Sequence, residues 1–238
     1  MLGNLNATFW QNLAKIFTSE EYMNMLFEGL GCTLLISFGA ALVGVVLGTL
    51  VAIVKIVPSK NPVMKVLNFI CNVYTTVFRG TPMALQLFIM AFVIFAIRGF
   101  PMEIVAILAF GINSGAYVSE SIRAGILSVD IGQTEAGRAL GLPYSKTIGK
   151  IVIPQAIKNV IPAIGNEFIA LIKETSIVSM VGGLYDLTLV AKILGGGDKL
   201  ASFLVPMVVV ALFYLAIVYS LTFVIKLVER RLRASDKR

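Results

Sequence analysis

The chain has 238 residues, a formal charge of +7, and a composition that is 58% hydrophobic but only 14% charged. Its mean hydropathy of +0.89 lies outside the range of ordinary soluble domains. The sequence has no histidine and only two cysteines, each inside an apolar stretch, which excludes histidine-based triads and proton relays and argues against a disulfide framework or a metal site. We therefore predict an all-α integral membrane protein, with membrane lipid around it and, despite the positive charge, no nucleic acid partner.

The N-terminal part is predicted to contain a lead-in helix and the first transmembrane span. Residues 1–28 lack the basic start, the early apolar run and the small-residue cleavage site of a secretory signal peptide, so we expect a partly amphipathic, extracytoplasmic helix there. Residues 29–54 carry no charge and are numerous enough to cross a bilayer. Residues 55–65 contain three lysines and two prolines, which end the span and indicate a short basic loop.

The second and third spans are predicted on either side of a brief polar turn. Residues 66–97 are apolar apart from Arg79, which is followed by a glycine and soon afterwards by a proline. This pair should break or kink the helix, so we expect the second span from about Met83. Residues 104–119 are apolar and rich in glycine, and they are expected to form the third span.

The C-terminal half alternates a long polar segment with two further apolar ones. Residues 124–158 carry six charged side chains between spans and are predicted to form a structured loop. Residues 159–183 are apolar but contain three further ionisable side chains, so this fourth span should face protein or a polar cavity. Residues 185–199 indicate a short helix and a glycine-rich surface loop. Residues 200–225 are uncharged again and form the predicted fifth span.

The distribution of Lys and Arg predicts the orientation of these five spans. Basic residues in short loops collect on the cytoplasmic side of a membrane. If the N-terminus lies outside, fourteen of the twenty basic residues fall in cytoplasmic segments and four in external ones. We therefore expect one transmembrane domain at residues 29–228, with an external N-terminus and a basic cytoplasmic tail at residues 229–238.

The most specific motif lies in the predicted cytoplasmic loop. A Glu-Ala-Gly trio at residues 135–137 is followed by an alanine, by a glycine four residues after the trio ends, and later by an Ile-Pro pair at residues 153–154. Small side chains let a short helix approach another surface closely, and the glycine with a nearby proline ends the helix and turns the chain. We interpret this helix as a docking element; the alternative is a cytoplasmic helical hairpin without a docking role. The assigned residues are Glu135, Ala136, Gly137, Ala139, Gly141 and Pro154.

This pattern resembles the EAA loop of ABC importer permeases, in which a Glu-Ala-Ala trio precedes a glycine and an Ile-x-Leu-Pro sequence. Gly137 stands here in place of the second alanine, and Ile153 in place of the usual leucine. The segments FRGTPMALQLF, GAYVSESIRAGILSV and IKETSI further resemble the polar amino acid permease subfamily, which includes histidine, glutamine, arginine and cystine permeases. The likeness extends over residues 25–232, which is most of the chain.

The resemblance implies a type I ABC importer transmembrane domain in the cytoplasmic membrane of a prokaryote, serving as the translocation pore for polar amino acids. The implied partners are two ABC ATPase subunits, a second permease subunit that is either a copy or a paralogue, and an extracytoplasmic amino acid-binding protein. Residues 141–147 contain Lys-Thr but lack the glycine that precedes the lysine of a phosphate loop. We therefore expect no enzyme activity and no cofactor in this chain, with ATP and magnesium on the partner ATPase.

Polar side chains within the predicted spans are candidates for the substrate pathway. An amino acid zwitterion needs donors for its carboxylate and acceptors for its ammonium group, and amides beside one carboxylate supply both. For Glu167, three alternatives remain open: contact with substrate, pairing with Lys173 or Arg79, and a solvated position near the membrane surface. The candidate pathway residues are Gln86, Asn113, Ser114, Tyr117, Asn166 and Glu167.

Two further interpretations have alternatives. The GxxxG motifs at residues 44–48 and 111–115 indicate close helix contacts, either inside the chain or between two permease subunits. The rival function is an ion-coupled secondary amino acid transporter, but such proteins typically have more spans and an internal repeat. The sequence does not determine which amino acid is carried.

Overall fold

The computed structural model describes residues 2–57, 61–197 and 199–234, and the secondary structure of these residues is helical, without a strand. The elements, in chain order, are α1 (Leu2–Thr18), α2 (Glu20–Ile56), α3 (Pro62–Gly80), α4 (Met83–Ile89), the π-helical η1 (Met90–Ile94), α5 (Met102–Leu127), α6 (Ile131–Ala139), α7 (Tyr144–Thr147), the π-helical η2 (Ile148–Val152), α8 (Ile153–Glu174), the 3₁₀-helical η3 (Thr175–Met180), α9 (Leu187–Gly195) and α10 (Leu204–Arg233).

The predicted first span lies in the C-terminal part of a longer helix, α2. Ser19 caps the N-terminus of α2 by accepting a hydrogen bond from the backbone N–H of Tyr22, and two glutamates occupy the first turn, where the helix dipole favours negative charge. Since α2 has 37 residues, residues 20–28 belong to this helix and the lead-in helix ends at Thr18. At about 1.5 Å per residue, α2 exceeds the thickness of the hydrocarbon core and has room to tilt.

The predicted break after Arg79 is confirmed. Thr81 adopts an extended conformation, Pro82 precedes α4, and the axis turns by 109° between α3 and the α4–η1 pair. The expectation that the second span begins at Met83 is wrong, because α4 and η1 together run only to Ile94, which is too short to cross a bilayer. The long helix is α3, which precedes the break.

Three of the described helices, α2, α5 and α10, are long and apolar enough to cross a membrane, and the bent α3–α4–η1 unit adds a fourth if it counts as one span. The predicted fourth span corresponds to α8 and η3, which fall outside this set because α8 carries several charged side chains. At the end of this segment the helix tightens: Thr175 and Ser176 begin η3, and their hydroxyls donate to the carbonyl oxygens of Ile172 and Lys173. The count of five spans stays a prediction.

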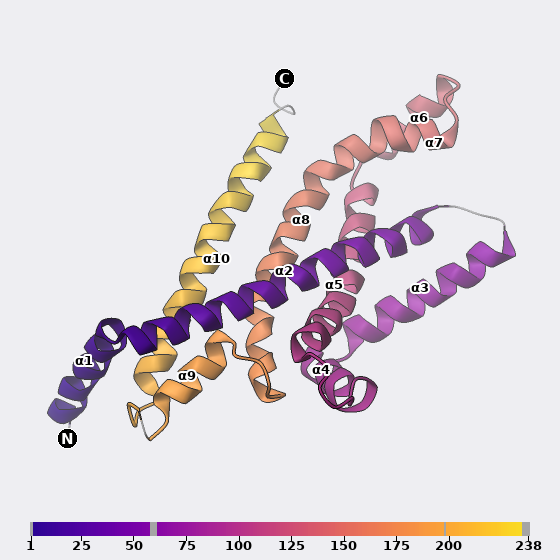
Figure 1. The fold of residues 1–238 in the computed structure, drawn as a ribbon. Coiled ribbons are helices and arrows are strands. Elements are labelled where there is room, and N and C mark those ends of the chain that lie inside the picture. The colour runs from indigo at the N-terminus through magenta and orange to yellow at the C-terminus, as the bar shows by residue number, and fades with distance from the viewer. Residues whose placement is uncertain (1, 58–60, 198, 235–238) are drawn as a thin grey trace.

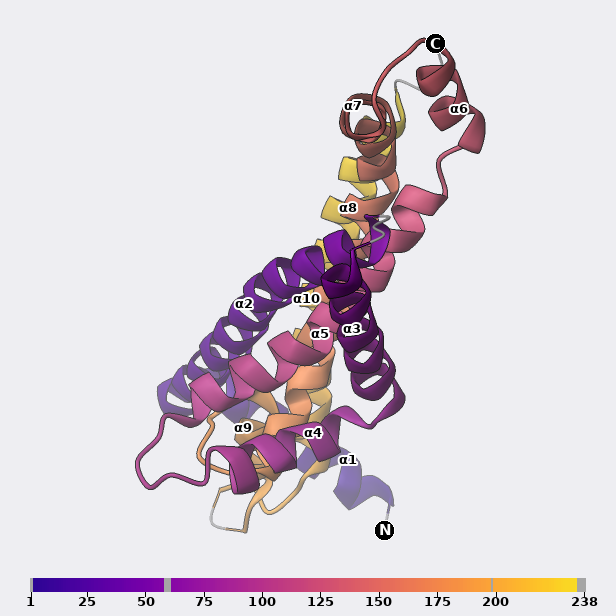
Figure 2. The ribbon, with the colours of Figure 1, turned by 90° about the vertical axis from the view of Figure 1, so that its right-hand side faces the viewer.

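The loop helices and the N-terminal helix lie far apart in space. Figures 1 and 2 place α6 and α7 at one end of the molecule and α1 and α9 at the other. The end with α6 and α7 contains the predicted cytoplasmic loop, and the opposite end contains the glycine-rich α9–α10 connection. Which end faces the cytoplasm remains a prediction from the charges.

The two GxxxG motifs pack against each other inside the chain. A Cβ atom added at Gly48 of α2 would lie 2.7 Å from the Val118 side chain and 2.8 Å from the backbone oxygen of Gly115 on α5. Likewise, a Cβ atom at Gly111 would lie 2.7 Å from Val43. Glycine therefore allows α2 and α5 to approach backbone to backbone, and the internal-packing alternative is confirmed.

Candidate functional site: the loop helix and the polar residues of the spans

The loop helix α6 has well-defined ends. Asp130 caps its start, with one carboxylate oxygen accepting a hydrogen bond from the backbone N–H of Gly132 at 2.6 Å. At its end, the N–H of Leu142 donates to the oxygen of Gly137, the N–H of Gly141 donates to that of Arg138, and Gly141 has a φ of +79°. This is a Schellman motif, which needs a left-handed residue where Gly141 stands.

The small residues of α6 serve two different contacts. Gly137 is buried, and a Cβ atom there would lie 2.7 Å from the Thr147 side chain, so its small size lets α6 pack on the following helix of the same chain. Glu135, Ala136 and Ala139 are exposed and remain available to a partner. The interpretation of Gly137 as part of the docking face is therefore wrong, because the second half of the loop covers it.

The other assigned loop residues lie at turns. A Cβ atom at Gly141 would meet nothing within 4 Å, so Gly141 is required by its backbone conformation rather than by a close contact inside the chain. Pro154 is exposed and lies at the start of α8, directly after the π-helical η2. Sequence reasoning missed Leu140, the last residue before the turn, whose side chain is 82% exposed.

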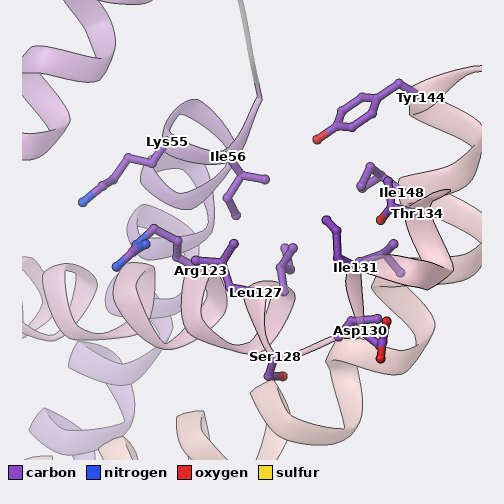
Figure 3. Close-up of a pocket in the computed structure, with 13 residues that line it drawn as sticks. Lys55, Ile56, Arg123, Leu127, Ser128, Asp130, Ile131, Thr134, Tyr144 and Ile148 are labelled. Carbon is purple, nitrogen blue, oxygen red and sulfur yellow. The ribbon is translucent and has the colours of Figure 1, made fainter.

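A pocket of about 610 Å³ separates the loop from the ends of α2 and α5. Figure 3 shows Lys55 and Arg123 on one side of it, Tyr144 on the other, and apolar side chains such as Leu127 and Ile131 between them. Since its walls come from α2, α5, α6, α7 and η2, a shift of the loop helix would change the shape of this pocket.

Beside this pocket, a charged network joins three helices. Lys55 of α2 forms an ion pair with Glu120 of α5 and donates to the hydroxyl of Thr75 on α3 at 3.1 Å. Arg123 Nε donates to the second oxygen of Glu120 at 2.9 Å. Glu120 therefore pairs with both cations, whereas Lys55 was counted from sequence only as part of a basic loop.

Two of the candidate pathway residues form hydrogen bonds at the break between α3 and α4. The Gln86 side-chain amide donates to the backbone oxygen of Phe78 at 2.9 Å and to the hydroxyl of Thr81 at 2.8 Å. Asn113 of α5 donates to the same Phe78 oxygen at 3.1 Å and to the side-chain oxygen of Gln86 at 2.9 Å. Both side chains are buried, and together they satisfy the carbonyl groups that the end of α3 leaves free.

Two of the remaining candidates, Tyr117 and Glu167, lie near Arg79. The guanidinium group of Arg79 lies over the ring of Tyr117, 5.3 Å from its centroid, and its charge also acts on the carboxylate of Glu167. Ser114 is buried beside Glu167, but no described group pairs with its hydroxyl at good hydrogen-bond geometry. Asn166 is exposed on α8.

The two pairing alternatives for Glu167 differ in their support. The charge of Arg79 acts on Glu167, whereas that of Lys173 acts on Glu174. Within residues 153–174, Glu167 and Lys173 are six positions apart on one helix and therefore point to different sides. No ion pair of Glu167 is present among the described residues, so its pairing with either cation stays a prediction.

Comparison with known proteins gives consistent matches over most of the chain. The family model described as "Binding-protein-dependent transport system inner membrane component" matches residues 44–234. The arginine transport system permease protein ArtQ of Bacillus subtilis (strain 168) is 41% identical over 213 residues, which cover 89% of this chain and 94% of ArtQ. The L-cystine transport system permease protein TcyB of the same organism is 34% identical over 222 residues, covering 90% of this chain and 88% of TcyB.

Solved structures show the same fold. The crystal structure of an amino acid ABC transporter with histidines contains a chain that matches with a TM-score of 0.81 and 37% identity, covering 89% of this chain and 95% of that one. An inward-facing structure of the MetNI methionine ABC transporter matches with a TM-score of 0.73 and 20% identity, covering 90% and 99%. The second match supports the fold alone.

Proposed function

The chain belongs to the family of inner membrane components of binding-protein-dependent transport systems, and from this premise we propose that it is the permease subunit of an ABC importer for polar amino acids. The matched region includes the loop helix and the membrane-spanning candidates, except that it omits residues 20–43 of α2. Relatives named for arginine and L-cystine transport support an amino acid as the cargo.

The exposed face of α6 is the observation that supports a coupled importer most directly. Glu135, Ala136, Ala139 and Leu140 are exposed on a short helix that projects beyond the long helices (Figure 2). A surface of small residues with one apolar side chain at its end suits insertion into a groove of another protein. We assign that groove to an ATPase subunit, so that ATP-driven motion reaches α5 and α8 through the two ends of the loop.

The proposed assembly contains two permease subunits, identical or paralogous, two ATPase subunits that hold ATP and magnesium, and an extracytoplasmic binding protein. It lies in the cytoplasmic membrane of a prokaryote, and this chain contributes the pathway without hydrolysing ATP. We place the substrate contacts of this subunit at Tyr117, Asn166 and Glu167, beside Arg79, because Gln86 and Asn113 use their amides at the helix break.

Reconstitution into liposomes tests this function. The chain, combined with an ABC ATPase and an amino acid-binding protein, is expected to take up an amino acid only when ATP is inside the vesicles on the ATPase side. Arginine, glutamine, histidine and cystine form the first panel of substrates. Uptake that needs an ion gradient and proceeds without ATP would instead establish a secondary transporter.

Glu167→Gln is expected to raise the substrate concentration for half-maximal uptake while the complex still assembles. Loss of one charge-assisted hydrogen bond costs about 1.5 to 3 kcal/mol, which corresponds to roughly ten- to a hundredfold in affinity. The measurement is uptake against substrate concentration, with thermal unfolding in detergent recorded for the same preparation. Glu103→Gln, a carboxylate in the first turn of α5, is the matched control.

The two readouts separate the alternatives for Glu167. If Glu167→Gln lowers the unfolding temperature but leaves the substrate concentration for half-maximal uptake unchanged, Glu167 has a structural role beside Arg79. Unchanged uptake and unchanged unfolding would remove it from the pathway.

A further inference from the structure

The N-terminal helix α1 presents three distinct faces. At about 100° per residue, Phe9, Asn12 and Ile16 share one side, and Trp10 and Phe17 share another. The remaining side carries the exposed polar residues Thr8, Gln11, Lys15 and Thr18. A helix that contacts only protein and water would need two faces, so the exposed apolar side requires an explanation.

The first face is fixed to the protein. Ile16 is fully buried in a cluster that includes side chains from the start of α2, from α9 and from α10, and Phe9 packs against the same cluster. The Asn12 side-chain amide donates to the backbone oxygen of Leu200 at 3.4 Å. The buried face therefore holds α1 against the α9–α10 connection.

The single cation of α1, Lys15, is exposed but still contacts the protein. Lys15 donates to the backbone oxygen of Lys199 at 3.4 Å and lies 5.7 Å from the centroid of the Tyr22 ring. Lys199 lies 5.0 Å from the centroid of the same ring and forms an ion pair with Glu21. These contacts link α1, the start of α2 and the α9–α10 connection into one cluster.

The second face is apolar, aromatic and exposed. Trp10 is 62% exposed and Phe17 53% exposed, with Ala14 between them. The Trp10 ring is braced edge-on by Phe9, with ring centroids 5.5 Å apart. After Ser19, exposed apolar side chains continue along α2 from Phe27, which is 56% exposed. The aromatic face of α1 therefore adjoins a helix that enters the bilayer.

We propose that α1 lies in the headgroup region of the membrane, with Trp10 and Phe17 inserted among lipids and its buried face holding the α9–α10 connection at the membrane surface. Trp is favoured at this depth because its ring is apolar and its N–H is polar. A helix with an apolar face and a separate polar face binds there by burying the apolar face about 5–10 Å deep. The lipid contact thereby fixes one external loop of the permease relative to the bilayer.

The sequence offers a direct probe, because Trp10 is the one tryptophan of the chain. The full transporter is reconstituted in lipid, and the fluorescence of a Trp10→Phe sample is subtracted to remove tryptophans of other subunits. Lipids brominated along their acyl chains are expected to quench most of the Trp10 emission, and aqueous iodide little of it. Strong iodide quenching without bromolipid quenching would overturn the proposal.

A matched pair of variants tests whether the apolar face of α1, and not its polar face, contacts lipid. Phe17→Lys introduces a charge beside Trp10 and is expected to shift its emission to longer wavelength and to increase iodide quenching. Thr18→Lys introduces the same charge on the polar face and should change neither. If Trp10 resists both quenchers and becomes accessible only when the binding protein is removed, the face is a protein contact and the lipid assignment fails.

Discussion

Glu135→Lys is expected to abolish ATP-driven uptake while the chain stays inserted and folded. Glu135 is exposed on the face of α6 that Ala136 and Ala139 share, and the caps of α6 do not involve it. Reversing its charge therefore alters the proposed docking surface without disturbing the helix. The measurement is ATP-driven uptake in proteoliposomes, together with copurification of the ATPase subunit. Gln133→Lys, on an exposed part of the same helix, is the matched control and should retain most uptake.

Substitutions at Gly141 add a second test of the same element. Gly141 has a φ of +79°, and a Cβ atom added there would meet nothing within 4 Å. A substitution would therefore destabilise the turn through the left-handed backbone and not through a steric clash. A left-handed backbone costs about 1–2 kcal/mol for most residues but less for Asn and Asp. Gly141→Val should therefore reduce uptake far more than Gly141→Asn, whereas Gly141→Asp combines a tolerated backbone with a new charge and should uncouple transport. Normal uptake by Gly141→Asp and Glu135→Lys together would remove the docking assignment.

Local signals in the sequence were sufficient to predict the helix break and the loop. Glycine and proline constrain the backbone within one or two residues, so the turn after Arg79 and the end of α6 follow from their neighbours alone. The length of an apolar run is likewise a local property. It predicted α2 and α10 well, apart from the first residues of α2, where an N-cap at Ser19 starts the helix before the uncharged run begins.

Pairings between distant residues were not predictable in the same way. Gln86 and Asn113 were assigned to a substrate pathway because both are polar and intramembrane, yet each amide is used at the α3–α4 break. The sequence shows that a break leaves carbonyl groups free, but not which amide reaches them. Gly137 was misassigned for a related reason, since a small residue allows close packing without indicating whether the neighbour is Thr147 or another protein.

The network around Glu120 predicts a large effect on stability. The side chains of Lys55 and Glu120 are only 9% and 17% exposed, so both charges are largely removed from water. Removing one partner of a buried ion pair typically costs about 3–5 kcal/mol because the other charge is left uncompensated. Glu120→Lys is more severe, since it would place three cations together where α2, α3 and α5 meet. We expect this variant to unfold at a much lower temperature in detergent and to assemble poorly with its partners.

Two controls separate pairing from simple damage to the site. Exchanging the charges in Lys55→Glu with Glu120→Lys restores an attractive pair between α2 and α5 and should recover a substantial part of the lost unfolding temperature. Arg123→Gln should have a small effect, because the Arg123 side chain is 41% exposed and solvent-exposed pairs contribute little. If Glu120→Lys unfolds at the wild-type temperature, or if the exchange is no more stable than either single change, the ion pair does not hold these ends of α2 and α5 together.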